Sequence, residues 1–371
     1  MSRRSFSTGL LAAADAGGPP PPPPPPPGGE DVFPEPLFAT QYAPWSIPAA
    51  GLPTHPNSSA LVADMYSVVP GTFNLNSDNF CPAFYSLENA NTNANLVVTN
   101  PSVSNLIGGV DTVPWNAAQF IPPPDSDAYV VLYNSTTGFC YEFFQTTYNS
   151  GSNTITATRA TIIRAGVERN DVGNANVLDK NNGFRVARAC GLHHAIGPIL
   201  RSEIDAGLIP HCTTMTYPNP PQFAHEAPAI KGAGTPSPNP QVGFMGIRMV
   251  WNFTDTEILN WANTFTPASI RPHLITIGTC IRDYGIMATD RGGLAVNKRG
   301  SVQLEHTLSA NWDELDMTDA NIRFVFDSLL GPNQAKARVI DIPIHVGGSD
   351  ANQACYPGVV YPAGHPCEGV A

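Results

Sequence analysis

The segment Pro122–Gln145, PPPDSDAYVVLYNSTTGFCYEFFQ, carries the clearest structural signal in this chain. Both of its arms are rich in Val, Tyr, Phe and Leu, and residues 134–138 between them are turn formers that end in glycine. This pattern predicts two antiparallel strands joined by a short turn. A symmetric turn would place Val130 opposite Glu142.

That register predicts which side chains share a face of the hairpin, because successive side chains of a strand alternate between its two faces. One face would carry Asp127, Tyr129, Tyr133, Tyr141 and Phe143. The other would carry Val130, Leu132, Cys140, Glu142 and Phe144. Aromatic rings stack on the C–H faces of sugars and a carboxylate accepts hydroxyl hydrogen bonds, so the first face predicts a sugar-binding groove. The plainer alternative is a sandwich core face with Asp127 at its exposed rim, since aromatic residues are common in strands.

Composition narrows the class of protein. The chain has 371 residues, of which 42% are hydrophobic and only 13% are charged, and its formal net charge is −11. Low charge with many Pro, Gly, Ser, Thr and Asn residues is typical of a secreted, β-rich protein. Nucleic acid and anionic membrane surfaces are not expected as partners of such an acidic chain, because no basic patch is available to release counterions. No segment approaches the roughly 20 apolar residues that a membrane span requires.

The N-terminus predicts three parts. Residues 1–18 pair two arginines with a short apolar run and resemble an export or targeting segment. Residues 19–32 contain an unbroken run of prolines, Pro19–Pro27, which predicts a stiff polyproline linker or an arm that docks on another subunit. Residues 33–371 are expected to form a single β-rich globular domain, with Trp45 anchoring its first, proline-rich segment.

An extracellular setting makes two kinds of modification plausible. N-glycosylation sequons begin at Asn57, Asn134 and Asn252. The seven cysteines lack CxxC spacing, which argues against a zinc ribbon, and Cys355 with Cys367 is the best local disulfide pair because the two bracket a Pro- and Gly-rich segment. The odd count leaves at least one thiol for other use.

The rest of the chain predicts many short strands and a few helices. Strands are expected at 80–87, 95–99, 154–164, 208–217, 247–251, 285–290 and 294–296, the last two forming a hairpin around Asp290-Arg-Gly-Gly. Helices are expected at 58–66, 195–206, 255–263 and 272–284, and residues 320–330 fit a helix or a strand. This order predicts a mainly β fold, a jelly-roll-like β-sandwich with short inserted helices, with an α+β domain as the alternative.

Several short islands resemble a group of uncharacterised exported bacterial proteins. They are Pro44-Trp45 with His55-Pro56-Asn57-Ser58, Ser126-Asp127-Ala128-Tyr129 with Thr137-Gly138 and Tyr141-Glu142-Phe143, Gly207-Leu208-Ile209-Pro210-His211, and Tyr284-Gly285 with Asp290. The resemblance spans residues 38–330 and brings no assigned activity. The group has His at the position of Tyr129, so any chemistry of that His would be absent here.

The polar groups to weigh for chemistry are Asp127, Glu142, His194, Glu203, His211, Asp283, Tyr284 and Asp290. A glycosidase needs two carboxyl groups across the bond, but the predicted register separates Asp127 from Glu142, and only a slip of one residue would reunite them. A polysaccharide lyase needs a His or Tyr base and a neutralising group, roles that His211, Tyr284 and Arg282 could fill. His193-His194 lack metal-ligand spacing, and no nucleotide or nucleophile motif occurs, so no metal or cofactor is expected.

Two functions of different class remain open. The first is a secreted extracellular protein that binds a polysaccharide or other glycan, as a lyase or hydrolase, with Asp127, Glu142, His211 and Tyr284 as catalytic candidates. Tyr129, Tyr141, Phe143 and Arg282 would then contact the substrate. The second is a non-catalytic extracellular subunit of a surface layer or filament, which would self-associate through its polyproline arm. Both fit a low charge and loops that tolerate glycans.

Overall fold

The computed structural model describes most of the chain. The described residues are 44–67, 71–101, 111–134, 139–164, 188–217, 229, 245–291, 298–341, 344–346, 353–356 and 359–360. The predicted targeting segment, polyproline arm and Cys355–Cys367 pair lie outside the residues whose side chains are described, and so does the strand expected at 294–296.

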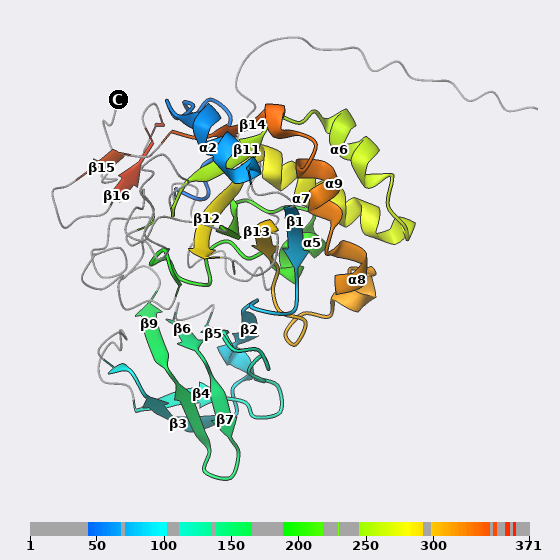
Figure 1. The fold of residues 1–371 in the computed structure, drawn as a ribbon. Helices are drawn as coiled ribbons and strands as arrows, with labels where there is room; N and C mark the ends of the chain where they lie inside the picture. Colours follow the sequence, from blue (N-terminus) through cyan, green and yellow to red (C-terminus); the bar gives the residue numbers. More distant parts are fainter. Residues whose placement is uncertain are drawn as a thin grey trace, which may run out of the picture.

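A six-stranded mixed sheet, here called the main sheet, forms the centre of the larger part of the molecule (Figure 1). Its strands lie in the order β1 (Thr72–Asn76), β13 (Lys298–Gln303), β10 (Thr213–Tyr217), β12 (Ile286–Arg291), β11 (Arg248–Trp251) and β14 (Ala337–Val339). β1 runs parallel to β13, and β10 runs parallel to β12. A separate short pair joins β15 (Ile344–Val346) to β16 (Gln353–Cys355).

Helices surround the main sheet, and local sequence signals explain their limits. They are α2 (Ser58–Tyr66), α5 (Arg201–Ala206), α6 (Asp255–Ala262), α7 (Arg271–Asp283), α8 (Asp319–Ile322) and α9 (Val325–Leu330). Single 3-10 turns occur at Leu87–Asn89, Ala268–Ile270, Trp312–Leu315 and Gln334–Lys336. Thr254 and Glu257 form a capping box at the start of α6, and the helical spacing of Leu274, Ile277 and Ile281 buries one face of α7.

The helices expected at 58–66, 255–263 and 272–284 are confirmed, and 320–330 is helical. The helix expected at 195–206 begins later, at Arg201, because Gly197 has a φ of +91° and Ile199 forms a bridge to Leu304. It ends at Gly207 in the left-handed conformation, as a C-terminal glycine predicts.

A second set of strands forms a small lobe, which spans residues 83–164. One sheet has the order β2 (Ala83–Ser86), β5 (Val130–Tyr133), β6 (Phe139–Phe144) and β9 (Arg159–Arg164). The other has the order β4 (Thr112–Trp115), β3 (Thr92–Val98), β8 (Thr154–Ala157) and β7 (Thr147–Asn149). The two sheets enclose their own hydrophobic cluster, which includes Trp115, Phe120, Leu132, Phe143 and Ile155. This lobe is sandwich-like, and the chain as a whole is sheet-rich with short helices, so the mainly β expectation is confirmed.

Two strand pairings differ from those expected. β5 and β6 form the predicted hairpin, but Val130 pairs with Phe143 and Val131 with Glu142, one residue out of the symmetric register. β12 pairs with β10 and β11, and the second strand of the hairpin expected around Asp290, residues 294–296, lies outside the described residues. The parallel pairs β2–β5 and β3–β8 also differ from the antiparallel pairing of a jelly roll.

The first described segment anchors onto the main sheet as expected. Trp45 is buried in the large hydrophobic cluster, and its carbonyl accepts a hydrogen bond from the Cys212 amide. The guanidinium of Arg248 donates to the carbonyls of Pro44 and Ile47. Within the described ranges, no helix combines the length and apolar character needed to cross a membrane.

Candidate functional site

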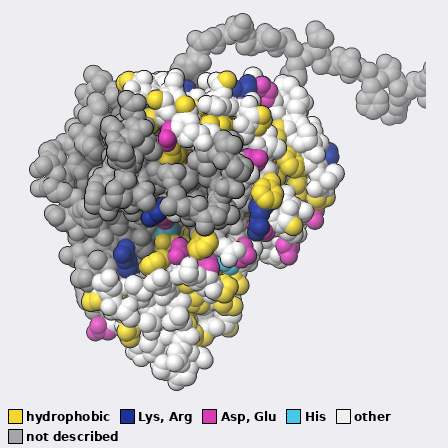
Figure 2. Space-filling model, in the orientation of Figure 1, with side chains coloured by type: hydrophobic (Ala, Val, Ile, Leu, Met, Phe, Trp, Pro, Cys, Tyr) yellow, Lys and Arg dark blue, Asp and Glu magenta, His cyan; other side chains and the backbone are white. Residues whose placement is uncertain are grey.

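Polar and ionisable side chains meet where the small lobe contacts the main sheet (Figure 2). The contact is made by a compact loop, residues 188–200, that lies between the two. The backbone amide of Cys190 donates to the carbonyl of Thr289 in β12, and the amide of His194 donates to the carboxylate of Glu142 in β6. The loop therefore fixes one end of β12 relative to the hairpin of the small lobe.

A buried arginine holds this loop in shape. Arg188 is fully buried, and its guanidinium donates to the carbonyls of His193 and Ile196 at 3.0 and 2.6 Å and to that of His194 at 3.4 Å. These hydrogen bonds offset the cost of burying the guanidinium and the cost of burying the three loop carbonyls. Because its donors serve the backbone, Arg188 organises the loop and is poorly placed to bind an anionic substrate.

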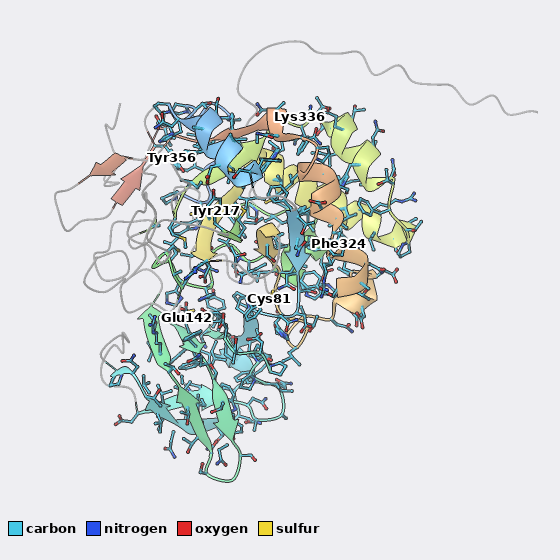
Figure 3. All side chains as sticks on the ribbon, viewed as in Figure 1. Cys81, Glu142, Tyr217, Phe324, Lys336 and Tyr356 are labelled. Atoms are coloured by element: carbon cyan, nitrogen blue, oxygen red, sulfur yellow. The ribbon has the colours of Figure 1, made fainter. Side chains whose placement is uncertain are left out.

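Glu142 lies on the face of β6 that points to this loop, beside Val131 and away from the small-lobe core. Its carboxylate oxygen Oε2 is 2.7 Å from Nδ1 of His193 and accepts the His194 amide at 2.7 Å. Burial alone would raise the pKa of Glu142, but the His193 and His194 interactions outweigh it and hold that pKa at about 2. Glu142 is thus an ionised, buried link between the lobe and the loop (Figure 3).

Tyr129 packs against the same loop. Its ring centroid is 3.6 Å from that of His194 and 5.0 Å from that of Phe144. Burial, and after it the charges of Asp290, Asp127 and Glu142, raises the pKa of the Tyr129 phenol well above its usual value. A phenol that resists ionisation is a poor general base, but it remains a good hydrogen-bond donor.

Two aspartates act electrostatically at this place, since burial and then the charge of Asp290 raise the pKa of both Asp127 and Tyr129. Asp127 enters from the small lobe just before β5, and Asp290 from the end of β12. Burial, the charge of Asp290 and then that of Asp125 raise the pKa of Asp127 to about 6. Two carboxylates carry like charges that repel, so ionising both is unfavourable. One of the two groups therefore stays protonated to higher pH than a lone aspartate.

Backbone irregularities place both aspartates. The register of β10 with β12 shifts between Met215 and Thr216, which leaves Thr289 as the extra residue before Asp290. On the small lobe, Ala128 and Gln145 have φ values of +40° and +53°, respectively. Bulges and left-handed residues re-aim side chains and are common beside functional sites.

Asp125 fixes the approach of Asp127. Its Oδ1 accepts the amides of Asp127 and Ala128, each at 2.8 Å, and its Oδ2 accepts the amide of Phe80 at 2.9 Å. Phe80 has a φ of +64° and an exposed ring, an unusual combination that the Asp125 bond helps to hold. Asp125 is therefore a positioning residue of this site.

The predicted aromatic face is not assembled as expected, because the register is shifted by one residue. Phe143 is fully buried in the core of the small lobe, and Tyr141 packs against that same core. Tyr129 lies on the opposite face, toward the loop with Glu142. The face assignment that grouped Tyr129, Tyr141 and Phe143 is wrong, and the slip that reunites Glu142 with the side of Tyr129 is what the structure shows.

The other predicted site residues lie in separate contacts of the larger part. His211 is buried with Nε2 2.7 Å from the Glu203 carboxylate, and this partner raises the His211 pKa even though burial opposes it. Arg282 pairs with Asp255 and Asp283. Tyr284 is buried, and its carbonyl accepts from Arg248. No contact in the described part of the chain links these residues to Asp127.

Asp290 was recognisable as a polar group but not as a neighbour of Asp127, since more than one hundred residues separate them. Arg188 carried no motif that would have identified it. Among the described side chains, no three His, Cys, Asp or Glu residues are grouped to hold a metal ion. Among the cysteines with described side chains, Cys81, Cys140, Cys212 and Cys280 are buried free thiols, and Cys190 is buried with its Sγ accepting the Leu192 amide. Of the sequon asparagines, Asn57 and Asn252 are exposed and Asn134 is half-buried.

Comparisons with known proteins supply no family for this site. No family model, curated protein or solved structure matches the chain.

Proposed function

We propose that this protein is an extracellular carbohydrate-active enzyme that hydrolyses glycosidic bonds of a neutral glycan. The observation that carries the proposal is the pair Asp127 and Asp290, where the small lobe meets β12. The pKa of Asp127 is about 6, and the like charge of Asp290 is, after burial, one of the causes that raise it. Glycoside hydrolysis requires one carboxyl group that is protonated near neutral pH and a second that is ionised.

The two aspartates would divide the work. Asp127 donates its proton to the glycosidic oxygen as the bond from that oxygen to the anomeric carbon breaks. A water molecule adds to the anomeric carbon and gives its proton to the Asp290 carboxylate. The products are two shorter glycans, and the proton taken by Asp290 returns to Asp127 through solvent.

Charge and pKa favour a hydrolase over a lyase. A lyase acts on a uronate and needs a base with a cationic or amide group beside the substrate carboxylate. Here Asp125, Asp127, Asp290 and Glu142 make the surroundings acidic, Arg188 is occupied by backbone carbonyls, and the Tyr129 phenol is difficult to ionise. An anionic sugar would be repelled, and Arg188 would not be available to neutralise its carboxylate.

The test is release of reducing ends from a panel of neutral polysaccharides, namely xylan, mannan, mixed-linkage glucan and soluble cellulose oligomers, with polygalacturonate as the anionic member. We expect hydrolysis of a neutral polymer, and we expect Asp127→Asn and Asp290→Asn each to lower turnover by about 100-fold or more. Asp111→Asn, an exposed aspartate of the small lobe, is the matched control and should keep full activity.

Two results would contradict the proposal. Unsaturated uronate products from polygalacturonate would assign a lyase. No product from any polymer, together with concentration-dependent self-association of the full chain, would favour the structural-subunit alternative.

A further inference from the structure

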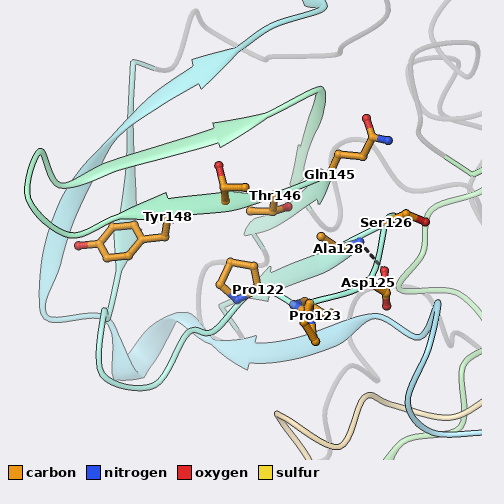
Figure 4. A pocket seen from close by; sticks show the side chains of 10 residues that line it. Pro122, Pro123, Asp125, Ser126, Ala128, Gln145, Thr146 and Tyr148 are labelled. Atoms are coloured by element: carbon orange, nitrogen blue, oxygen red, sulfur yellow. Dashed lines mark hydrogen bonds between the residues drawn. The ribbon is translucent and has the colours of Figure 1, made fainter.

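The small lobe carries a hollow beside the segment that leads into β5 (Figure 4). Its volume is about 390 Å³, within the range of roughly 300 to 1,000 Å³ common for small-ligand pockets. Its lining comes from two segments, residues 122–126 with Ala128 and residues 145–148. These are the two segments that flank Asp127 and the hairpin.

The hollow is directly connected to Asp127 through the backbone. The amide of Gln145 donates to the Asp127 carbonyl at 2.7 Å, and the amide of Thr146 donates to the Ala128 carbonyl at 3.3 Å. The backbone of Gln145, at one edge of the hollow, is therefore hydrogen-bonded to the backbone of Asp127.

The walls of the hollow combine apolar rings with polar groups. Pro122, Pro123 and Tyr148 supply ring faces, on which the C–H faces of a sugar can pack. Gln145 is exposed at the edge of the hollow, and its Oε1 accepts from the Thr158 hydroxyl, so its amide nitrogen can donate to a bound ligand. The hydroxyl of Thr146 is buried and also has no partner in the described part of the chain. Unsatisfied buried polar groups at a pocket are expected to meet a ligand or water.

We propose that this hollow is a binding subsite for a non-reacting sugar unit of a neutral glycan, with Gln145 as its specificity-determining residue. The proposal rests on the hydrolase function proposed above and names where the substrate is held. Ring faces with a few hydrogen-bonding groups and no lysine or arginine fit an uncharged hydroxylated ligand. Asp125, which lines the hollow and also holds the Asp127 amide, links the subsite to the reacting pair.

The experiment measures binding, so it does not depend on catalysis. Neutral hexasaccharides of xylose, mannose and glucose are titrated calorimetrically into the full-length Asp127→Asn protein. We expect one of them to bind, and we expect adding Gln145→Ala to weaken that binding about tenfold. Gln334→Ala, an exposed glutamine on the 3-10 turn before β14, is the matched control and should leave the affinity unchanged.

A second variant guards against indirect effects. Gln145→Glu keeps the acceptor for Thr158 but removes the amide donor, so it should weaken binding as Gln145→Ala does, with an unchanged melting temperature. In the active protein, Gln145→Ala should raise KM about tenfold while kcat changes less than twofold.

The outcomes separate the two proposals. Hexasaccharide binding that needs Gln145 but comes without turnover would support the subsite and overturn the hydrolase. Turnover with unchanged KM in both Gln145 variants would overturn the subsite and leave the hydrolase intact. Binding of a proline-rich peptide in place of every hexasaccharide would also overturn the subsite.

Discussion

Glu142 is the residue on which the contact between the small lobe and the loop of residues 188–200 depends most. It is almost fully buried, it contacts His193, and it accepts the amide of His194, so removing its charge affects both the lobe and the loop. Breaking one partner of a buried, charged hydrogen-bonded pair typically costs about 3 to 5 kcal/mol.

We expect Glu142→Gln to lower the free energy of unfolding at pH 7 by about 3 kcal/mol and to flatten its dependence on acid pH. The folded pKa of about 2 lies below the ordinary value of 4.5, so the stabilisation is present above pH 4.5 and is lost as pH falls toward 2. Urea titrations from pH 3 to 7 measure this. Glu314→Gln removes an exposed carboxylate near Arg201 and should change stability by less than about 1 kcal/mol.

Equal losses for the two glutamate variants would contradict the account of Glu142 as a buried link. So would an acid limb of the stability curve that is the same in the Glu142→Gln and wild-type proteins.

At the scale of elements, the turn from α7 into β12 delivers Asp290 to the site. Gly285 makes this turn with a φ of +83°, and a Cβ at this position would lie 2.2 Å from the Met249 carbonyl oxygen. Gly207, after α5, has a φ of +69° but open space around its missing Cβ. A side chain at Gly207 would meet only the strain of the left-handed backbone, whereas one at Gly285 would meet that strain and a steric overlap with β11.

We expect Gly285→Ala to destabilise the protein by about 3 kcal/mol or more, because β11 must shift as well as the turn. Gly207→Ala should cost only about 1 kcal/mol, the price of a left-handed alanine. Thermal and urea unfolding of both variants measure the difference. Similar losses at the two positions would show that β11 yields easily and that the packing of β12 is not tight.

The elements themselves were largely predictable, whereas their pairing was not. Helix α7 follows from apolar spacing and β5 from its β-branched and aromatic content, and both are local properties. The β5–β6 register was missed because Tyr133 pairs with Cys140, which leaves residues 134–139 between the paired positions, one residue more than the prediction assumed. One residue of slip exchanges the faces of a strand, so that single error misplaced Tyr141 and Phe143.

Only the part of the candidate site that comes from the small lobe could be predicted from the sequence. Asp127 and Tyr129 stand in one aromatic-rich segment, and for that reason both were predicted as site residues. Asp290 comes from β12, whose neighbours in the main sheet are β10 and β11. Which strands and lobes meet is a property of the tertiary structure. Nothing in the residues around Asp290 indicates that the small lobe lies beside it.

On the scale of the whole molecule, the net charge of −11 should exclude anionic glycans. Repulsion between exposed charges is screened over about 10 Å at 0.1 M salt and about 3 Å at 1 M. We therefore expect any binding of polygalacturonate to strengthen as salt is raised, and binding of a neutral polysaccharide to stay constant. Affinity electrophoresis at several salt concentrations measures both. Tight polygalacturonate binding that salt weakens would indicate a basic surface and contradict the preference for neutral substrates.

The most direct test of the aspartate pair is a carbon-13 NMR titration of the Asp127 carboxyl group in the full-length protein, with Asp127→Asn providing the assignment. We expect a pKa of about 6 in the wild-type protein and a lower pKa in the Asp290→Asn variant, because the like charge of Asp290 is then absent. A wild-type pKa near the ordinary value of 3.8, or one that Asp290→Asn leaves unchanged, would contradict it.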